Sequence, residues 1–247
     1  MGPREHQQKM PSFPSTRDSV IERIRSADPP SRRGAFDDLV AGYWKPVYKY
    51  LRLTWRLSDE DAEDLTQAFF SDAFEKAWLE RFDPDRARFR TFVRLCADRL
   101  VMNRKQSESR LKRGGAVETV AVDFAEAERE LLAHHASMPP DAEELFRREF
   151  IRSLFDRAVA SVRSEYERAG RSLHLRLFER YDLAPVEGLT YADLASEFGL
   201  TTTQVTNYLA QIRRSFRTHA LGALEALSGS REEFRREARE LFGVVVE

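Results

Sequence analysis

Apolar residues recur at helical spacing along most of this chain, and this pattern constrains its fold more than any other feature. The first such stretch follows i, i+3, i+4 and i+7 spacing and contains Phe36, Leu39, Val40 and Tyr43. No alternation of apolar and polar residues is long enough to build a sheet. The sequence therefore predicts an all-α fold.

Composition divides the chain into successive segments. Prolines among polar residues indicate a flexible N-terminal tail at 1–33, with one short helix near Val20–Ile24. A small helical domain is expected at 34–113, and an acidic stretch with few aromatic residues at 114–140 indicates a flexible linker. A second small helical domain is expected at 141–227, followed by a helical extension at 228–247. The expected architecture is two small helical domains joined by a flexible linker.

Local capping signals predict where several helices begin and end. Ser58 with Asp61 is typical of the start of a helix, which we expect to run from Asp59 to about Glu80. Asp141 is expected to cap a long helix, and Gly170 is expected to end it.

Further helix signals lie on either side of these. Pro46 separates two apolar helical stretches and implies a kink or a break. Another helix is expected from about Ala87 to Gln106. Ser230 with Glu233 predicts a cap for the C-terminal extension. The apolar face of that extension comprises Phe234, Ala238, Leu241 and Phe242. We interpret the extension as a lid on the second domain or as a helix that contacts a partner.

Charge is segregated along the chain, although the formal net charge is only −1. Acidic residues dominate 59–80, basic residues dominate 86–113, and acidic residues dominate again at 114–144. Such a mosaic indicates two kinds of partner, one a protein and the other a polyanion. The alternative interpretation is a set of ordinary solvated surfaces.

Several classes of protein are disfavoured by composition. Cys96 is the single cysteine, so no internal disulfide can form, and its apolar neighbours indicate a core position. No apolar run approaches the roughly 20 residues that a membrane-spanning helix needs, and no signal peptide is recognisable. We expect a cytoplasmic protein without membrane insertion. His134 and His135 are the only candidate metal pair, and adjacent histidines do not converge on one ion. No metal, cofactor or catalytic residue is expected.

Residues Tyr191–Gln211 carry the most specific local pattern, that of a helix-turn-helix. Apolar residues share one face of the first expected helix at Tyr191, Leu194, Ala195 and Phe198. Gly199 follows at a position where a tight turn needs positive φ. Thr201 with Gln204 predicts a capping box for the second helix. This order of features is typical of helix-turn-helix DNA-binding proteins.

The outward face of that second helix has side chains suited to reading bases. Asn and Gln can bond adenine edges, Thr can contact a thymine methyl, and Arg can bind guanine or phosphate. Arg213 and Arg217 are expected to contact the DNA backbone beside it. The remaining candidates on this face are Thr203, Thr206, Asn207, Gln211 and Arg214. The inward face comprises Val205, Tyr208, Leu209, Ile212 and Phe216. The outward face carries neither Glu nor Lys, which favours DNA recognition over an ordinary solvated surface.

An acidic helix face and a basic helix come earlier in the chain. Glu63, Asp64 and Gln67 share one face, where clustered like charges cost a few tenths of a kcal/mol per pair. A basic partner would offset that cost. Phe89 and Phe92 lie among the arginines of the next helix and could stack on bases, although we interpret both as core. The nucleic-acid candidates of this helix are Arg86, Arg88, Arg90, Arg99 and Asn103.

The order of these parts resembles a known family. The segments Asp61–Gln67, Phe82–Arg86 and Arg88–Phe92 resemble region two of the extracytoplasmic-function class of bacterial RNA polymerase sigma factors. Leu189–Ala195 with Gly199–Leu200 resembles region four of the same class. Sigma factors catalyse no reaction, so the resemblance implies a non-enzymatic subunit that directs core polymerase to promoters.

The resemblance also implies roles for individual positions. Asp61, Glu63, Asp64 and Gln67 are expected to bind the clamp helices of the largest polymerase subunit. The loop Phe82–Phe89 and the helix through Asn103 are expected to melt and read the minus-10 element. The second helix of the helix-turn-helix is expected to read the minus-35 element. The acidic linker is expected to thread the interior of the polymerase.

Regulation of the chain is open at this point. An anti-sigma factor or a regulatory kinase is a further candidate partner. Thr66, beside the docking acids, is a hypothetical phosphorylation site, although its place on the apolar side of the helix favours burial.

Two other functions are considered. A transcription regulator could bind DNA through Tyr191–Arg214 without joining polymerase, and it would have no use for the acidic face around Asp61–Gln67. An enzyme is disfavoured because no cluster of Cys or His accompanies His134 and His135.

Overall fold

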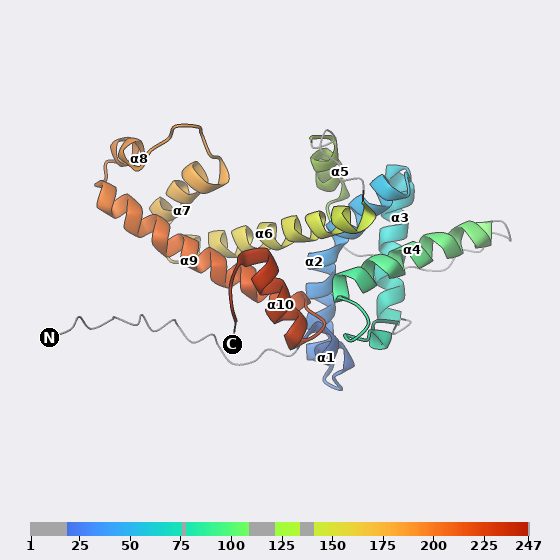
Figure 1. The fold of residues 1–247 in the computed structure, drawn as a ribbon. Helices are drawn as coiled ribbons and strands as arrows, with labels where there is room; N and C mark the ends of the chain where they lie inside the picture. The colour runs from blue at the N-terminus through green and yellow to red at the C-terminus, as the bar shows by residue number, and fades with distance from the viewer. Residues whose placement is uncertain (1–18, 76–77, 109–121, 134–140, 247) are drawn as a thin grey trace.

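The computed structural model describes residues 19–75, 78–108, 122–133 and 141–246, and the regular structure in these ranges is helical (Figure 1). The all-α prediction is confirmed. Residues 1–18 of the expected tail, and 114–121 and 134–140 of the expected linker, lie outside the described residues. No helix in the described ranges has the length and apolar character needed to cross a membrane.

The first N-terminal helix lies where a short helix was expected, and the second begins earlier than expected. The short helix α1 (Val20–Arg25) and the long helix α2 (Pro29–Thr54) both start within the segment interpreted as a tail. The Asp28 side chain accepts a hydrogen bond from the Ser31 amide, and prolines fill the first positions of α2, where their missing N–H costs nothing. α2 continues through Pro46, so the expected break does not occur.

Helices α3 (Asp59–Glu75) and α4 (Phe89–Glu108) complete the first helical group with α2, and the 3-10 turn η1 (Trp78–Arg81) lies between them. The Asp61 amide donates to Ser58 Oγ, which confirms the predicted cap. Phe89 is fully buried and packs edge-on against Phe82, so its interpretation as core is confirmed.

Part of the segment expected as a flexible linker is a helix, α5 (Phe124–Ala133). It buries Ala127 and Leu131 against the core that contains α2. Its carboxylates meet cations of α2: Glu130 lies 2.7 Å from Lys45 Nζ, and Glu128 pairs with Arg52. The acidic residues that suggested a solvated linker therefore pair with charges brought close by the fold.

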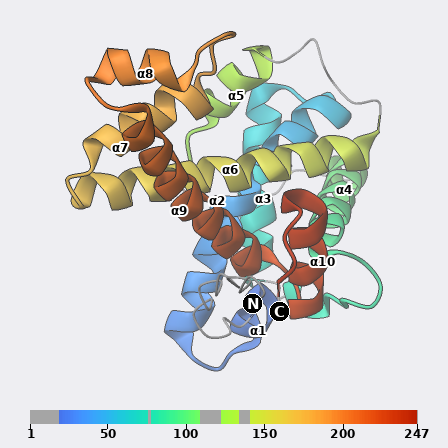
Figure 2. The same cartoon turned by 60° about the vertical axis from the view of Figure 1, so that its left-hand side comes forward.

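The C-terminal half of the chain consists of α6 (Ala142–Arg168), α7 (Ser172–Phe178), a π-helical turn η3 (Glu179–Leu183), α8 (Tyr191–Phe198), α9 (Thr202–Leu227) and α10 (Arg231–Phe242). Asp141 caps α6, and Gly170 follows its end with φ 66°, as predicted. Figures 1 and 2 show α6 and α9 running from the end that carries α7 and α8 towards α2 and α10.

The two long helices α6 and α9 contribute to more than one core. Near its start α6 buries Phe146 and Phe150 in the same core as α2, while Val162 and Tyr166 lie in a smaller core with α7 and α9. Gly42 of α2 allows α9 to approach closely, because a Cβ there would collide with Leu227. The helical groups are therefore joined by packed helices as well as by the connecting chain.

Candidate nucleic-acid and protein interfaces

Helices α8 and α9 meet at a tight turn that exposes one side of α9. Gly199 has φ 66°, and its amide bonds the Ala195 carbonyl at the end of α8. The Thr201 side chain accepts from the Gln204 amide and the Gln204 side chain accepts in return, which confirms the predicted capping box. Val205 and Leu209 are buried beneath α9. The exposed residues of α9 include Thr203, Thr206, Asn207, Gln211, Arg214 and Arg217. This surface is therefore continuous along the first half of α9.

Arg213 differs from its neighbours on α9 because its guanidinium binds within the fold. It forms hydrogen bonds to Asp182 at 2.8 Å and to the Tyr191 hydroxyl at 2.9 Å, and it lies over the Tyr181 ring. The bond to Asp182 raises the pKa of Arg213 further. These contacts join η3 and α8 to α9, and the expected contact of Arg213 with the DNA backbone stays a prediction. The sequence hid this role because Asp182 lies 31 residues away.

His174 of α7 holds part of the exposed surface of α9. Its Nε2 lies 3.2 Å from Gln211 Oε1, and its ring lies over Tyr208 with 4.1 Å between centroids. Burial lowers the pKa of His174, although the bond to Gln211 opposes the shift. A neutral imidazole with the proton on Nε2 donates this bond, so it orients the amide of Gln211 before any ligand arrives.

The acidic candidates of α3 form an exposed face at the start of that helix. Asp61 and Asp64 are exposed, while Glu63 and Gln67 are half-buried. Arg104 of α4 lies 3.8 Å from each of the two exposed aspartates. Burial raises the pKa of Glu63, and the charges of Asp59, Asp64 and Glu128 add to the shift. The face is therefore under electrostatic repulsion that a basic partner would relieve.

Thr66 lies on the opposite side of α3 from these acids. Its side chain is only 1% exposed, and its hydroxyl donates to the Ala62 carbonyl at 2.7 Å. The expectation of burial is confirmed. A kinase could reach this hydroxyl only if α3 left its neighbours.

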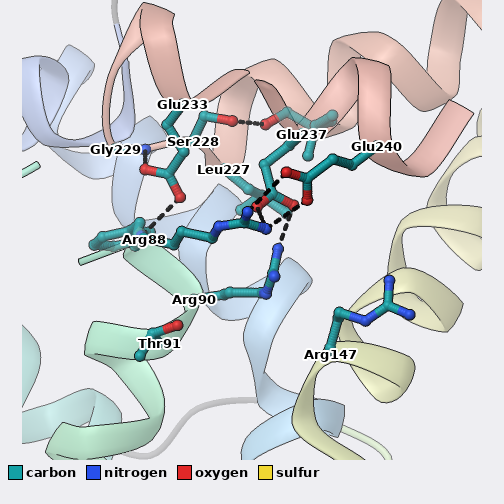
Figure 3. Close-up of polar contacts among 12 residues, drawn as sticks. Arg88, Arg90, Thr91, Arg147, Leu227, Ser228, Gly229, Glu233, Glu237 and Glu240 are labelled. Atoms are coloured by element: carbon teal, nitrogen blue, oxygen red, sulfur yellow. Dashed lines mark hydrogen bonds and ion pairs between the residues drawn. The ribbon is translucent and has the colours of Figure 1, made fainter. Parts of the chain in front are cut away.

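The basic residues around the start of α4 differ sharply in exposure. The Arg86 side chain is 86% exposed, and its nearest carboxylate is Asp83 in the same loop. Arg99 and Asn103 are exposed further along α4. Arg88 and Arg90, in contrast, are covered by acidic residues of α10 (Figure 3). In this structure, therefore, only part of the expected nucleic-acid surface is open.

Glutamates of α10 make the contacts that cover these arginines. Glu240 accepts from Arg88 at 2.7 and 2.8 Å, and Glu237 accepts from both Arg88 and Arg90. Glu233 accepts from the backbone amides of Phe89 at 2.7 Å and Gly229 at 3.1 Å. The sequence analysis did not assign these glutamates a role in binding the arginines, although their spacing was a signal. These acids recur at i, i+4 and i+7, beside the apolar stripe of the extension.

Glu233 has a pKa raised to about 7, because burial disfavours its charge more than the two amide hydrogen bonds favour it. The folded protein therefore keeps a proton that the unfolded chain loses above its ordinary pKa of 4.5. It follows that the stability due to this group is fully present below that value, and is lost as pH rises through about 7.

We expect Glu233→Gln, which cannot ionise, to lose this pH dependence. One pKa unit corresponds to about 1.4 kcal/mol, so the wild type should lose about 2–3 kcal/mol more than the variant between about pH 5 and pH 8. Urea unfolding at both pH values measures the difference. Glu232→Gln, on the exposed side of α10, is the matched control. Equal pH slopes for wild type and Glu233→Gln would contradict the assignment.

The remaining candidates concern metal and thiol chemistry. Cys96 packs partly buried against the main core, and burial raises the pKa of its thiol to about 12. This agrees with the expected core position, because a neutral thiol is a poor nucleophile. Among the described residues, no three His, Cys, Asp or Glu side chains are grouped to hold a metal ion. His134 and His135 lie outside the described residues.

Comparison with protein families finds a match for one part of the chain. Residues 39–111, which include most of α2 and all of α3 and α4, match the model of sigma-70 region 2. No curated protein and no solved structure shows significant similarity to the chain. The match supports a factor of the sigma-70 family with a role in promoter recognition. It implies interaction with the RNA polymerase core and promoter DNA, and sigma factors are non-enzymatic.

Proposed function

We propose that this chain is a sigma factor of the extracytoplasmic-function class, which directs core RNA polymerase to promoters and initiates transcription there. The observation that carries the proposal is the exposed face of α9 behind a tight, capped turn, in a chain that also contains a sigma-70 region 2 match. The exposed face of α9 supports the reading of an upstream DNA element. The region 2 match supports contact with polymerase and with the melted promoter DNA.

The upstream element is read, in this proposal, by α9 in the major groove. The segment Leu189–Leu200 then corresponds to the start of region four, and α9 presents its exposed side chains to the bases. Asn207 and Gln211 can each make paired hydrogen bonds to adenine, and the nearby threonines can contact thymine methyl groups. Arg214 and Arg217 are placed to bind phosphates. Reading and phosphate binding are thereby divided between different side chains.

Two substitutions separate base reading from phosphate binding on α9. Asn207→Ala should cost about 1–3 kcal/mol on the preferred element and flatten the preference at one base pair. Arg217→Ala should weaken binding to all sequences alike and lower the salt slope by roughly 1. Binding to single-base variants at two salt concentrations measures both effects.

Arg168→Ala, at an exposed position near the end of α6, is the control for these measurements. It should change neither base preference nor salt slope. A uniform loss of affinity for Asn207→Ala, without a change in base preference, would contradict the assignment of this side chain to base reading.

The downstream element is melted and read near α4. Arg86, Arg99 and Asn103 are exposed along this helix and the loop before it. Arginines neutralise phosphates of a single strand, and strand opening follows from binding energy gained with unpaired bases. The acidic face formed by Asp61, Glu63, Asp64 and Gln67 then binds the clamp helices of the polymerase. Its unfavourable like charges support a basic partner.

A single experiment tests the proposal as a whole. The purified chain is incubated with core RNA polymerase, and co-elution and promoter-dependent transcription are measured. We expect both. A chain that binds promoter DNA specifically, but neither co-elutes with polymerase nor starts transcription, is a helix-turn-helix regulator that acts alone. That result would overturn the proposal.

A further inference from the structure

Three hydrogen-bond donors at the start of α4, the side chains of Arg88 and Arg90 and the amide of Phe89, form a cradle for anions. Carboxylates of α10 occupy this cradle (Figure 3). Arg88 and Arg90 extend towards α10, and the amide of Phe89 points the same way. Three carboxylates of α10 accept these donors. Strong donors of this kind, two guanidinium groups and a backbone N–H, also bind phosphate oxygens.

Arg90 shows that the cradle is not fully used by α10. Its side chain is 6% exposed and Glu237 is 3% exposed, so this pair is buried. The Nε atom of Arg90 is nevertheless buried without a hydrogen-bond partner in the described part of the chain. A donor left unpaired in a buried cationic site is available to a further acceptor.

The attachment of α10 is partly apolar and partly ionic. Phe234 and Ala238 are buried in the main core, and Phe242 lies beside Phe155 of α6. Gly229 approaches Phe82 so closely that a Cβ would collide with its ring. α10 thus packs against α6 and α9 as well as against the start of α4. Its interpretations as a lid on the second domain or as a helix that contacts a partner stay predictions.

We propose that α10 is an internal competitor of DNA, whose carboxylates occupy the phosphate-binding cradle of Arg88, Arg90 and the Phe89 amide until a nucleic-acid strand replaces them. The inference rests on the proposed function, because it assigns regulation to the surface that contacts the melted promoter. Carboxylate and phosphate use the same donors, so both cannot occupy the cradle together. In the free protein the cradle is closed, and DNA binding requires α10 to move.

The physical properties of α10 fit a segment that leaves and returns. It has 12 residues, most of them charged, and an isolated helix of this length is marginal in water. Its stability therefore comes from docking. The ion pair between Arg88 and Glu240 is partly exposed and screened by salt. The pair between Arg90 and Glu237 is buried, so removal of one partner leaves a buried charge unpaired and is costly. Glu237 is thus the group whose removal should open the cradle most.

The first test removes one carboxylate and measures DNA affinity of the full-length chain. The probe is a fluorescently labelled single-stranded oligonucleotide, and its binding is measured by fluorescence anisotropy. We expect Glu237→Gln to bind at least about tenfold more tightly than wild type. Glu232→Gln changes the same charge on the exposed side of the same helix, and it should alter affinity less than about twofold. An equal gain in DNA affinity for both variants would mean that the effect comes from net charge alone, and it would overturn the inference.

A second variant displaces α10 without changing charge. Gly229→Ala places a methyl group against the ring of Phe82 and close to Glu233, so the contact between the start of α10 and Phe82 must open. We expect tighter DNA binding again. Gly222→Ala, where a Cβ meets nothing within 4 Å, is the matched control and should leave affinity unchanged. This pair keeps the inference testable should Glu237→Gln fold poorly.

Amide hydrogen exchange of the wild type tests the competition directly. Saturating oligonucleotide should accelerate exchange in 231–242 and leave the amides of α6 unchanged. DNA binding with full protection of α10, or unchanged affinity in both Glu237→Gln and Gly229→Ala, would overturn the inference.

The transcription assay distinguishes failure of the inference from failure of the proposed function. Wild-type transcription with core polymerase, together with unchanged affinities, would leave the proposed function standing without the competitor. Absence of polymerase binding in every variant would instead remove the proposed function, and the affinity and exchange results would still decide the role of α10.

Discussion

Reversal of Glu63 and Asp64 to lysine is expected to abolish binding to core RNA polymerase and promoter-dependent transcription. Both side chains lie on the side of α3 that faces away from the core, and clustered acids are suited to a basic partner surface. Two reversed charges place lysines against that surface, and like-charge juxtaposition costs several kcal/mol. Co-elution with polymerase and transcription from a cognate promoter measure the loss.

The fold should survive this double reversal. Burial raises the pKa of Glu63, and its acidic neighbours add to the shift, so a lysine there relieves their repulsion. At Asp64 the ion pair with Arg104 is long and exposed, so its loss costs little. Asp37→Lys with Glu167→Lys makes the same charge change at exposed positions elsewhere and should leave polymerase binding intact. If the variant with Glu63 and Asp64 reversed co-elutes normally with polymerase, the assignment of α3 to the polymerase interface is wrong.

Truncation of Lys49 to alanine is expected to cost about 3–5 kcal/mol of unfolding free energy, the typical effect of breaking a buried ion pair. The Lys49 side chain is 1% exposed, and its Nζ lies 2.6 Å from Glu130 of α5 and 2.9 Å from Glu149 of α6. Without the ammonium group, Glu149 stays buried beside Arg152 alone. The change should therefore loosen α5 and α6 together. Urea unfolding gives the free energy, and amide exchange in α5 gives the local effect.

Two further variants make the Lys49 prediction specific. Lys105 is exposed at the end of α4, and Lys105→Ala should cost less than about 1 kcal/mol. Lys49→Met combined with Glu149→Leu removes both charges of a buried pair and should recover part of the loss, because no carboxylate at 149 is left unpaired. If Lys49→Ala is as stable as wild type, the network does not hold the helices together.

The sequence predicted the parts of the structure that depend on neighbours in the chain. The capping boxes and the glycines that end helices depend on groups within a few residues of each other, so their chemistry is readable directly. Asp28 with two following prolines was a signal of the same kind for the start of α2, but the prolines were interpreted as part of a tail. The apolar stripe of α10 was likewise readable from its spacing.

The candidate surfaces were predictable to a smaller extent. Helical periodicity placed Asn207 and Gln211 on an outward face, because α9 is regular and packs on one side. The same reasoning made Arg213 a DNA contact, since periodicity does not tell which charges find a partner inside the fold. The partners of the Arg213 guanidinium are Asp182 and Tyr191, which come from η3 and α8.

By itself the sequence determined the helical class, several helix ends, and the apolar residues that face inward on helices such as α8, α9 and α10. Those properties follow from spacing, capping and backbone conformation, which act over one or two helical turns. Only the tertiary structure decided which charges meet. Glu130 pairs with Lys49 across 81 residues, and Glu237 pairs with Arg90 across 147. Ion pairs between distant residues leave no repeating pattern in the sequence, because the attraction between two charges depends on their distance in space and not along the chain. Residues 124–133 of the expected linker thus form a packed helix, and the C-terminal helix covers Arg88 and Arg90 at the start of α4.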